Sequence, residues 1–221
     1  KRQDQDRYII KKEENMSQLL NGLYVITDEQ LTPDEHVHSY VEDALIAGAS
    51  IVQYRNKTKS DEEVEEVCRT LQSLCTNYNV PFIIDDRPHL AAKIGADGIH
   101  IGKDDMPVQE ARKIFPKGII GVSCYGSIRK AKEAQEEGAD YVAFGSFFPS
   151  PTKPHSGVIS INVLHKAKEA VDIPVCAIGG IGQTNIHEIA ATNIDMISVV
   201  SSAFKGDTQQ NVSNLIKGMK I

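Results

Sequence analysis

The stretches AGASIVQY (47–54), IGADGIHI (94–101) and EGADYVAFG (137–145) share one plan, in which Gly-Ala and a small polar residue precede a short, largely apolar run. Gly at the end of a helix adopts the left-handed conformation at little cost, so each Gly predicts a helix end just before a strand. ATNID (191–195) fits the same plan with Asn in the glycine position. The repeat therefore predicts several helix-to-strand transitions of one kind.

Outward from these stretches, β-branched runs alternate with segments of helical periodicity from Leu23 onward. The eight runs that favour strands are LYVIT (23–27), SIVQY (50–54), FIID (82–85), GIHI (98–101), GIIGVS (118–123), YVAFG (141–145), PVCAIG (174–179) and MISVVS (196–201). The helical segments between them include 61–78, 108–115, 127–137, 161–171 and 185–191. Such alternation predicts a parallel sheet covered by helices.

A closed (β/α)₈ barrel, the TIM barrel, is favoured over an open doubly wound sheet. The chain offers eight units without a break in composition, and no GxGxxG motif follows the first predicted strand. Residues 1–16 are polar and carry mixed charges, and Met16 is a candidate original start, so we expect a disordered or non-native leader there. Residues 17–221 are expected to form one catalytic domain.

Composition narrows the classes of function. The 221 residues are 41% hydrophobic, enough for one sizeable core. A formal charge of −6, with Lys and Arg scattered, argues against nucleic-acid binding.

The four cysteines show neither CxxC nor zinc spacing, which predicts reduced thiols in a cytosol. No apolar run approaches the roughly 20 residues of a membrane span, and the N-terminal stretch has no signal-like apolar core. We therefore expect a cytoplasmic protein with no membrane partner, whose oligomeric state stays open.

The second predicted strand runs into Gln53, Tyr54, Arg55, Asn56 and Lys57. If the extended geometry persists, Gln53, Arg55 and Lys57 share one face. Cations that face inward at a barrel mouth are costly unless an anion compensates them, which favours an anion site. The alternative is a pair of solvated loop charges.

Carboxylates follow the third and fourth predicted strands. Asp85 and Asp86 end one, and Asp104 and Asp105 follow the other. Neighbouring strand ends can place two carboxylates on one hard cation, and Mg²⁺ commonly takes one or two protein carboxylates together with phosphate oxygens and water. Asp86 and Asp105 are therefore the candidate Mg²⁺ ligands, and helix N-capping is an equally good interpretation from spacing alone.

Three further strand ends favour phosphate. The loop at 147–157 surrounds Lys153 with hydroxyls, although a proline-rich connector is the alternative. Loops after strands seven and eight recur as phosphate sites on this fold. Ser123, at the end of strand five, suits a hydroxyl donor to an anion, and His100, in mid-strand, is as good a core residue as a ligand. The residues concerned in the three loops are Ser150, Pro151, Thr152, Lys153, Gly179, Gly180, Val200 and Ser201.

These patterns, taken together and in order, resemble the thiamin phosphate synthase family from Leu23 to about Lys217. The matching motifs are YVITD (24–28), QYRNK (53–57), DDRPHLA (85–91), GIHIGKDDMP (98–107), GVSCY (121–125), FGSFFPSPTK (144–153), AIGGI (177–181) and VVSSA (199–203).

The resemblance implies a Mg²⁺-dependent transfer of a hydroxymethylpyrimidine group from its diphosphate to the nitrogen of a thiazole phosphate carboxylate, with release of pyrophosphate. It implies that Asp86 and Asp105 hold the metal, and that Arg55, Lys57, Ser123 and Lys153 form the catalytic group. The residues implied to meet the pyrimidine diphosphate are Gln53, Arg55, Lys57, Asp85, Ser123 and Lys153. Those implied to hold the thiazole phosphate are Ser150, Pro151, Thr152, Gly180, Val200 and Ser201.

Some positions depart from the family pattern. Lys103, Asp85 and Tyr125 stand where Gln, Asn and His are usual, and Ser146 and Ser150 replace Pro and Thr. Two other functions compete with the synthase: a TenI-like thiazole tautomerase, which would need a general acid or base near position 125, and a sensor that binds thiamin phosphates without turnover.

Overall fold

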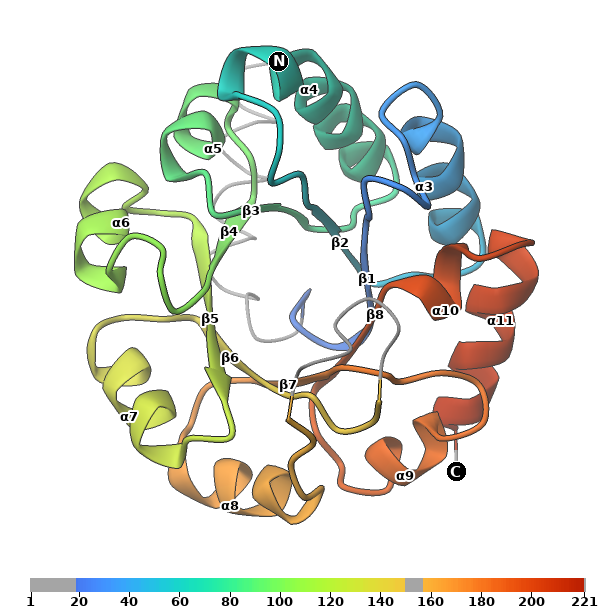
Figure 1. Ribbon diagram of the computed structural model, residues 1–221. Coiled ribbons are helices and arrows are strands. Elements are labelled where there is room, and N and C mark those ends of the chain that lie inside the picture. The colour runs from blue at the N-terminus through green and yellow to red at the C-terminus, as the bar shows by residue number, and fades with distance from the viewer. Residues whose placement is uncertain (1–18, 150–156, 221) are drawn as a thin grey trace.

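The computed structural model describes residues 19–149 and 157–220. Eight parallel strands pair in chain order, and the eighth closes on the first (Figure 1). The predicted TIM barrel is thus confirmed. The strands are β1 Gly22–Ile26, β2 Ile51–Tyr54, β3 Phe82–Asp85, β4 Gly98–Ile101, β5 Ile119–Tyr125, β6 Tyr141–Phe144, β7 Val175–Ile178 and β8 Met196–Val199.

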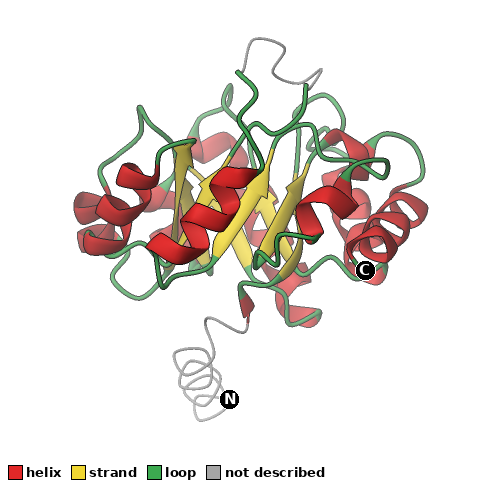
Figure 2. Ribbon diagram, turned by 90° about the horizontal axis from the view of Figure 1, so that it is seen from below, coloured by secondary structure: helices red, strands yellow, loops and turns green. Residues whose placement is uncertain are grey.

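Helices surround the barrel on its outside (Figure 2). They are α3 Val37–Ile46, α4 Asp61–Asn77, α5 Pro88–Ile94, α6 Val108–Ile114, α7 Ile128–Glu136, α8 Asn162–Ala170, α9 Ile186–Ala190, α10 Ser201–Phe204 and α11 Thr208–Met219. None of the helices in the described part of the chain has both the length and the apolarity needed to cross a bilayer.

The strands are buried on both faces, as parallel strands under helices must be. Successive side chains point alternately into the barrel and toward the helices. Tyr24, Ile83 and Tyr141 belong to an inner cluster, whereas Val25, Ile84 and Val142 pack in the layer beneath the helices. This alternation explains why the strands read as continuous apolar runs. It also directs polar side chains at the inward positions of the strand ends toward the mouth of the barrel.

The sequence repeat forms the same kind of helix-to-strand connection several times. Gly48, Gly95 and Gly138 have φ of 102°, 70° and 95°, and Asn193 has φ of 54°, so the predicted left-handed helix ends are confirmed. In three copies an Asp follows and accepts a hydrogen bond from the start of the preceding strand. The three bonds are Phe82 N to Asp97 (2.8 Å), Ile120 N to Asp140 (2.7 Å) and Val175 N to Asp195 (2.7 Å).

The bounds of β3 and β4 are the predicted ones, and those of the other strands differ from prediction by one or two residues. The clearest difference is β5, which continues two residues past the predicted end at Ser123. Its pairing with β6 shifts register between Ser123 and Tyr125, and Tyr125 has φ of 58°. The shift is typical of a bulge, which re-aims side chains next to a site. The predicted leader at 1–16 lies outside the described residues.

Candidate active site

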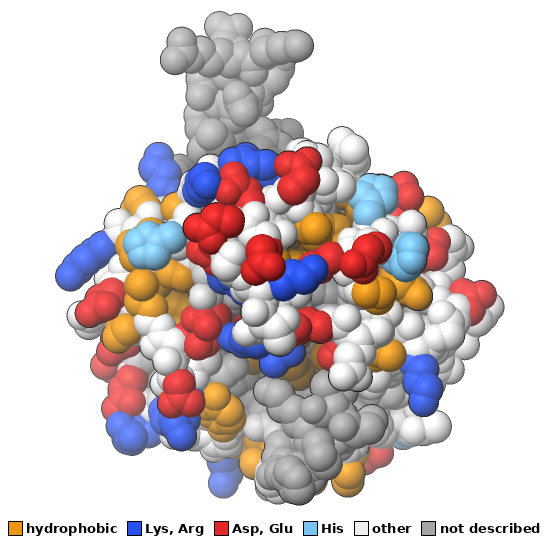
Figure 3. Space-filling model, turned by 45° about the horizontal axis from the view of Figure 1, so that its top comes forward, with side chains coloured by type: hydrophobic (Ala, Val, Ile, Leu, Met, Phe, Trp, Pro, Cys, Tyr) orange, Lys and Arg blue, Asp and Glu red, His pale blue; other side chains and the backbone are white. Residues whose placement is uncertain are grey.

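A hollow of about 700 Å³ opens at the C-terminal ends of the strands. A second hollow of about 470 Å³ adjoins it, and both are lined by Lys57, Asp85, Asp104 and Asp105. Figure 3 shows acidic and basic side chains close together on the visible face of the molecule. The site is therefore an open mouth in which charges of both signs meet.

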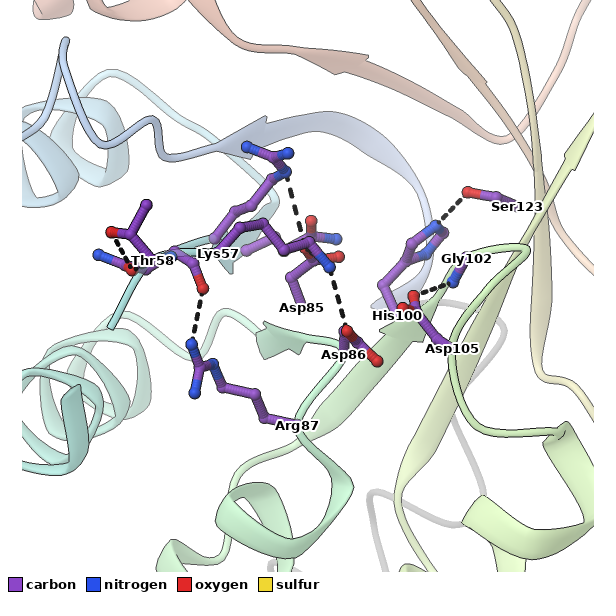
Figure 4. Close-up of polar contacts among 12 residues, drawn as sticks. Lys57, Thr58, Asp85, Asp86, Arg87, His100, Gly102, Asp105 and Ser123 are labelled. Atoms are coloured by element: carbon purple, nitrogen blue, oxygen red, sulfur yellow. Dashed lines mark hydrogen bonds and ion pairs between the residues drawn. The ribbon is translucent and has the colours of Figure 1, made fainter. Parts of the chain in front are cut away.

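Lys57 lies between Asp85, the last residue of β3, and Asp86, which follows it (Figure 4). Its Nζ is 3.0 Å from Asp85 Oδ2 and 3.2 Å from Asp86 Oδ2, and Arg55 Nε is 3.6 Å from the same Asp85 atom. Burial opposes the charged form of Lys57, but the surrounding carboxylates, with Asp85 foremost, outweigh it and raise the pKa of this lysine. Lys57 is thus a charged ammonium at neutral pH, held at the rim by anions.

The loop that carries Lys57 is held by hydrogen bonds to the loops that follow β1 and β3. Lys57 N donates to Glu29 Oε1 at 2.7 Å, and this bond with that from Thr58 lowers the pKa of Glu29. Asn56 turns its side chain onto its own loop, where Oδ1 accepts from Lys59 N at 2.9 Å. Arg87 Nη2 donates to the carbonyls of Asn56 and Lys59 at 2.7 and 2.6 Å. The loops after β2 and β3 therefore form one unit.

Asp86 and Asp105 adjoin each other. Burial and the carboxyl of Asp105 together raise the pKa of Asp86 to about 6, against the opposing charge of Lys57. Asp105 Oδ2 also accepts from Gly102 N at 2.6 Å, and Asp86 has φ of 56°, a strained value for a residue other than Gly. Two carboxylates held together despite their repulsion fit a hard divalent cation.

Asp86 and Asp105 are the two described carboxylates that could hold such a cation. No group of three or more potential His, Cys, Asp or Glu ligands exists in residues 19–149 and 157–220. Water and phosphate oxygens would have to complete the coordination, which is typical of Mg²⁺.

His100 joins Ser123 to a buried row of hydroxyls. Its Nε2 lies 2.8 Å from Ser123 Oγ, and its Nδ1 lies 2.8 Å from the hydroxyl of Tyr141. The Tyr141 hydroxyl is 2.9 Å from that of Tyr24, which accepts from Gln53 Nε2 at 2.6 Å. His100 and Ser123 line the larger hollow.

The opposite side of the hollow is built from the ends of β7 and β8. Gly179 and Gly180 have φ of 106° and 68°, and a Cβ on Gly180 would lie 2.4 Å from the carbonyl oxygen of Phe148. Gly is required here because the strand β6 loop passes directly over the backbone. Asn185 Nδ2 donates to Gly180 O at 3.0 Å, and Ser202 Oγ donates to Ile181 O at 2.8 Å. Exposed backbone and serine hydroxyls thus contribute to this wall.

The structure brings together only some of the predicted residues. Those that line the larger hollow are Arg55, Lys57, Asp85, Asp105, Ser123, Gly179, Gly180, Val200 and Ser201. Asp86 and Asn56 line the smaller one. Ser150, Pro151, Thr152 and Lys153 lie outside the described residues.

Gln53 and Tyr54 line neither hollow. Gln53 is buried beneath the mouth, and Tyr54 points outward and donates to Asp34 Oδ1 at 2.8 Å. Tyr24 and Tyr141 were not among the predicted site residues. Their alternation with outward-facing apolar neighbours was the available signal, since a phenol inside a barrel needs a polar partner.

The chain is similar to one family throughout this barrel. A family model described as thiamine monophosphate synthase matches residues 23–203. The thiamine-phosphate synthase of Wolinella succinogenes is 45% identical over 206 residues, covering 91% of this chain and 95% of that protein. That of Thermoplasma acidophilum is 40% identical, covering 90% of this chain and 92% of that protein.

Solved structures agree with this similarity. The thiamine phosphate pyrophosphorylase of Pyrococcus furiosus superposes with a TM-score of 0.84 at 39% identity, covering 91% of this chain and 96% of that one. A 3-hexulose-6-phosphate synthase, with a TM-score of 0.66 at 13% identity, covers 90% of this chain and 99% of that one, and shares the fold alone.

Proposed function

Because the chain belongs to the thiamine monophosphate synthase family and has its transferase activity, we propose that the hollow joins a pyrimidinylmethyl diphosphate to a thiazole phosphate. The single observation that carries this proposal is the meeting of Arg55 and Lys57 with the Asp86–Asp105 pair at one rim. Two cations and a metal-binding pair suit a diphosphate, which carries several negative charges.

The reaction needs charge stabilisation more than proton transfer. The bond between the methylene carbon and the diphosphate oxygen breaks, and the electron pair leaves with pyrophosphate. The thiazole nitrogen then uses its own lone pair to form the new carbon–nitrogen bond, so no strong base is required. The protein has to stabilise the departing anion and to place the nucleophile.

We assign the leaving group to the rim at β2, β3 and β5. Arg55, Lys57 and Ser123 would bind the diphosphate, together with Lys153. At an effective dielectric of 20, one cation–phosphate pair at 4 Å contributes about 4 kcal/mol before desolvation. A few such contacts supply a large part of the barrier reduction.

Asp86 and Asp105 would hold Mg²⁺, in keeping with their forced proximity. When bound, the ion neutralises charge on the diphosphate and polarises its oxygens. Asp85, where the family usually has Asn, pairs with Lys57 at 3.0 Å and Arg55 at 3.6 Å. It holds both cations near the site before substrate arrives and competes with the diphosphate for them afterwards.

The thiazole phosphate is assigned to the side of the hollow that Gly179 and Gly180 line, which we call the glycine wall. Gly179 and Gly180 permit close approach to the backbone, and Val200 and Ser201 open the short helix α10 beside them. Ser150, Pro151 and Thr152, which lie outside the described residues, are assigned to the same phosphate by the family resemblance alone. The cytosolic location expected from the cysteines is part of the same proposal, and Cys68, Cys75, Cys124 and Cys176 are free and buried.

Incubation of the pure protein with both substrates and Mg²⁺, with and without EDTA, tests this function. Without EDTA, we expect thiamin phosphate and pyrophosphate to form in equal amounts. With EDTA, which chelates the Mg²⁺, we expect neither product. Metal-independent isomerisation of the thiazole substrate alone would instead indicate the tautomerase, and saturable binding without turnover would indicate the sensor.

A further inference from the structure

We propose that His100 is a positioning residue, which holds the Ser123 hydroxyl as a hydrogen-bond donor to the substrate anion through a one-way chain of hydrogen bonds that begins at Gln53. The identity of that anion as a diphosphate rests on the proposed function. The direction of the chain does not.

The direction is set where the chain begins. Gln53 Nε2 donates to the hydroxyl oxygen of Tyr24 at 2.6 Å. A phenol has a single proton to donate, and a buried donor without a partner is costly. Tyr24 is fully buried, and the hydroxyl of Tyr141 lies 2.9 Å away. The Tyr24 proton therefore points to Tyr141, and the Tyr141 proton is left to point onward.

The onward partner is His100. With the Tyr141 proton directed at it from 2.8 Å, Nδ1 of His100 is an acceptor, so the neutral ring has its proton on Nε2. Burial raises the pKa of both phenols above the usual value, so each keeps the proton that the chain requires. Nε2 then donates to Ser123 Oγ at 2.8 Å.

Ser123 is the last residue of this series of hydrogen bonds and lines the larger hollow, as do Arg55 and Lys57. Because its oxygen accepts from His100, its own proton is directed away from the histidine and into the hollow. The reverse direction would present only oxygen lone pairs to the diphosphate, which repel it. The direction in which the Ser123 hydroxyl donates its proton is thus determined by side chains from five strands, β1, β2, β4, β5 and β6.

The tautomer of His100 tests the proposal without any substrate. Protein labelled with ¹⁵N-histidine is examined by long-range ¹H–¹⁵N spectra at pH 8. We expect the proton on Nε2 in the parent protein and in Tyr54→Phe, whose lost hydroxyl bonds to Asp34 outside these hydrogen bonds, and loss of this preference in Tyr141→Phe. A proton on Nδ1 in the parent, or identical spectra for the two phenylalanine variants, overturns the proposal.

Kinetics test the consequence. His100→Leu should lower kcat by about tenfold to a hundredfold, because this is the rate loss expected when one hydrogen bond to a charged group is lost. His100→Gln, whose amide can donate to Ser123, should retain more of the rate. In a Ser123→Ala background, His100→Leu should cost little more, whereas full multiplication of the two losses contradicts a role through Ser123. If the parent showed no transfer at all, the proposed function would fail while the tautomer experiment still decided this proposal.

Discussion

Lys57 Nζ lies 3.2 Å from Asp86 Oδ2, so a cation that follows β2 contacts a carboxylate that follows β3. The contact links the two halves of the proposed chemistry, since the proposal assigns Lys57 to the diphosphate and Asp86 to the metal. It adds to the stronger effect of Asp85, 3.0 Å from the same Nζ, which raises the pKa of Lys57 and keeps it charged in a partly buried position.

Lys57→Ala should lower kcat/KM by about a hundredfold, because it removes one preorganised charge from the leaving group. The measurement is steady-state turnover at saturating Mg²⁺. Lys93→Ala is the matched control, since Lys93 pairs with Glu65 on the exposed helix surface at 2.6 Å. A Lys57 variant as fast as this control would remove Lys57 from the mechanism.

Asp86→Asn and Asp105→Asn should each weaken Mg²⁺ binding, because one charged ligand is replaced by a neutral one. We expect the Mg²⁺ concentration for half-maximal rate to rise at least tenfold in each, with a smaller loss of rate at saturating metal. Asp172→Asn, a change at an exposed carboxylate outside the lining of both hollows, serves as control. Unchanged metal dependence in both variants would place the ion elsewhere.

The raised pKa of Asp86 predicts a pH dependence of stability in the metal-free protein. Its pKa is about 6 when folded, against an unfolded value of about 3.9, so the native state binds more protons between these values. This residue therefore contributes a loss of stability as pH rises from about 4 to about 6.

Urea denaturation in EDTA at pH 4.5 and pH 7.5 measures that contribution. The parent should lose stability relative to Asp86→Asn on going to the higher pH, because Asn never ionises. Parallel behaviour of the two proteins would show that Asp86 titrates normally.

Gly180→Ala should destabilise the protein by about 1–3 kcal/mol and impair the site, because φ of 68° strains any Cβ and the carbonyl of Phe148 lies in its way. Gly182→Ala is the comparison, since a Cβ there meets Ser202 Cβ at an ordinary 3.6 Å. Thermal unfolding of both variants gives the result. Equal thermal unfolding midpoints for the two variants would mean that the backbone at Phe148 can move to accommodate the added methyl group at little cost.

The fold was predictable because local signals agreed with one another. Gly95, Gly138 and Asn193 marked helix ends by backbone sterics alone, and Asp97, Asp140 and Asp195 repeated at the same offset. Hydrophobic periodicity and helix-ending residues depend on near neighbours in the chain, so they can be recognised from the sequence without the structure.

The site was only partly predictable, for reasons of geometry. The shared face of Gln53, Arg55 and Lys57 assumed an extended chain, but β2 ends at Tyr54. Arg55 and Lys57 still reach the hollow, while Gln53 bonds to Tyr24 below it. Contacts such as His100 with Tyr141, 41 residues apart, depend on which side chains meet inside the barrel, and one sequence does not specify that.

A crystal structure with Mg²⁺ and pyrophosphate bound tests the central claim most directly. We predict one ion that contacts both Asp86 and Asp105, with pyrophosphate oxygens on that ion and within hydrogen-bond distance of Arg55 and Lys57. Pyrophosphate bound at the glycine wall alone, or an ion that leaves either carboxylate without contact, would contradict the account.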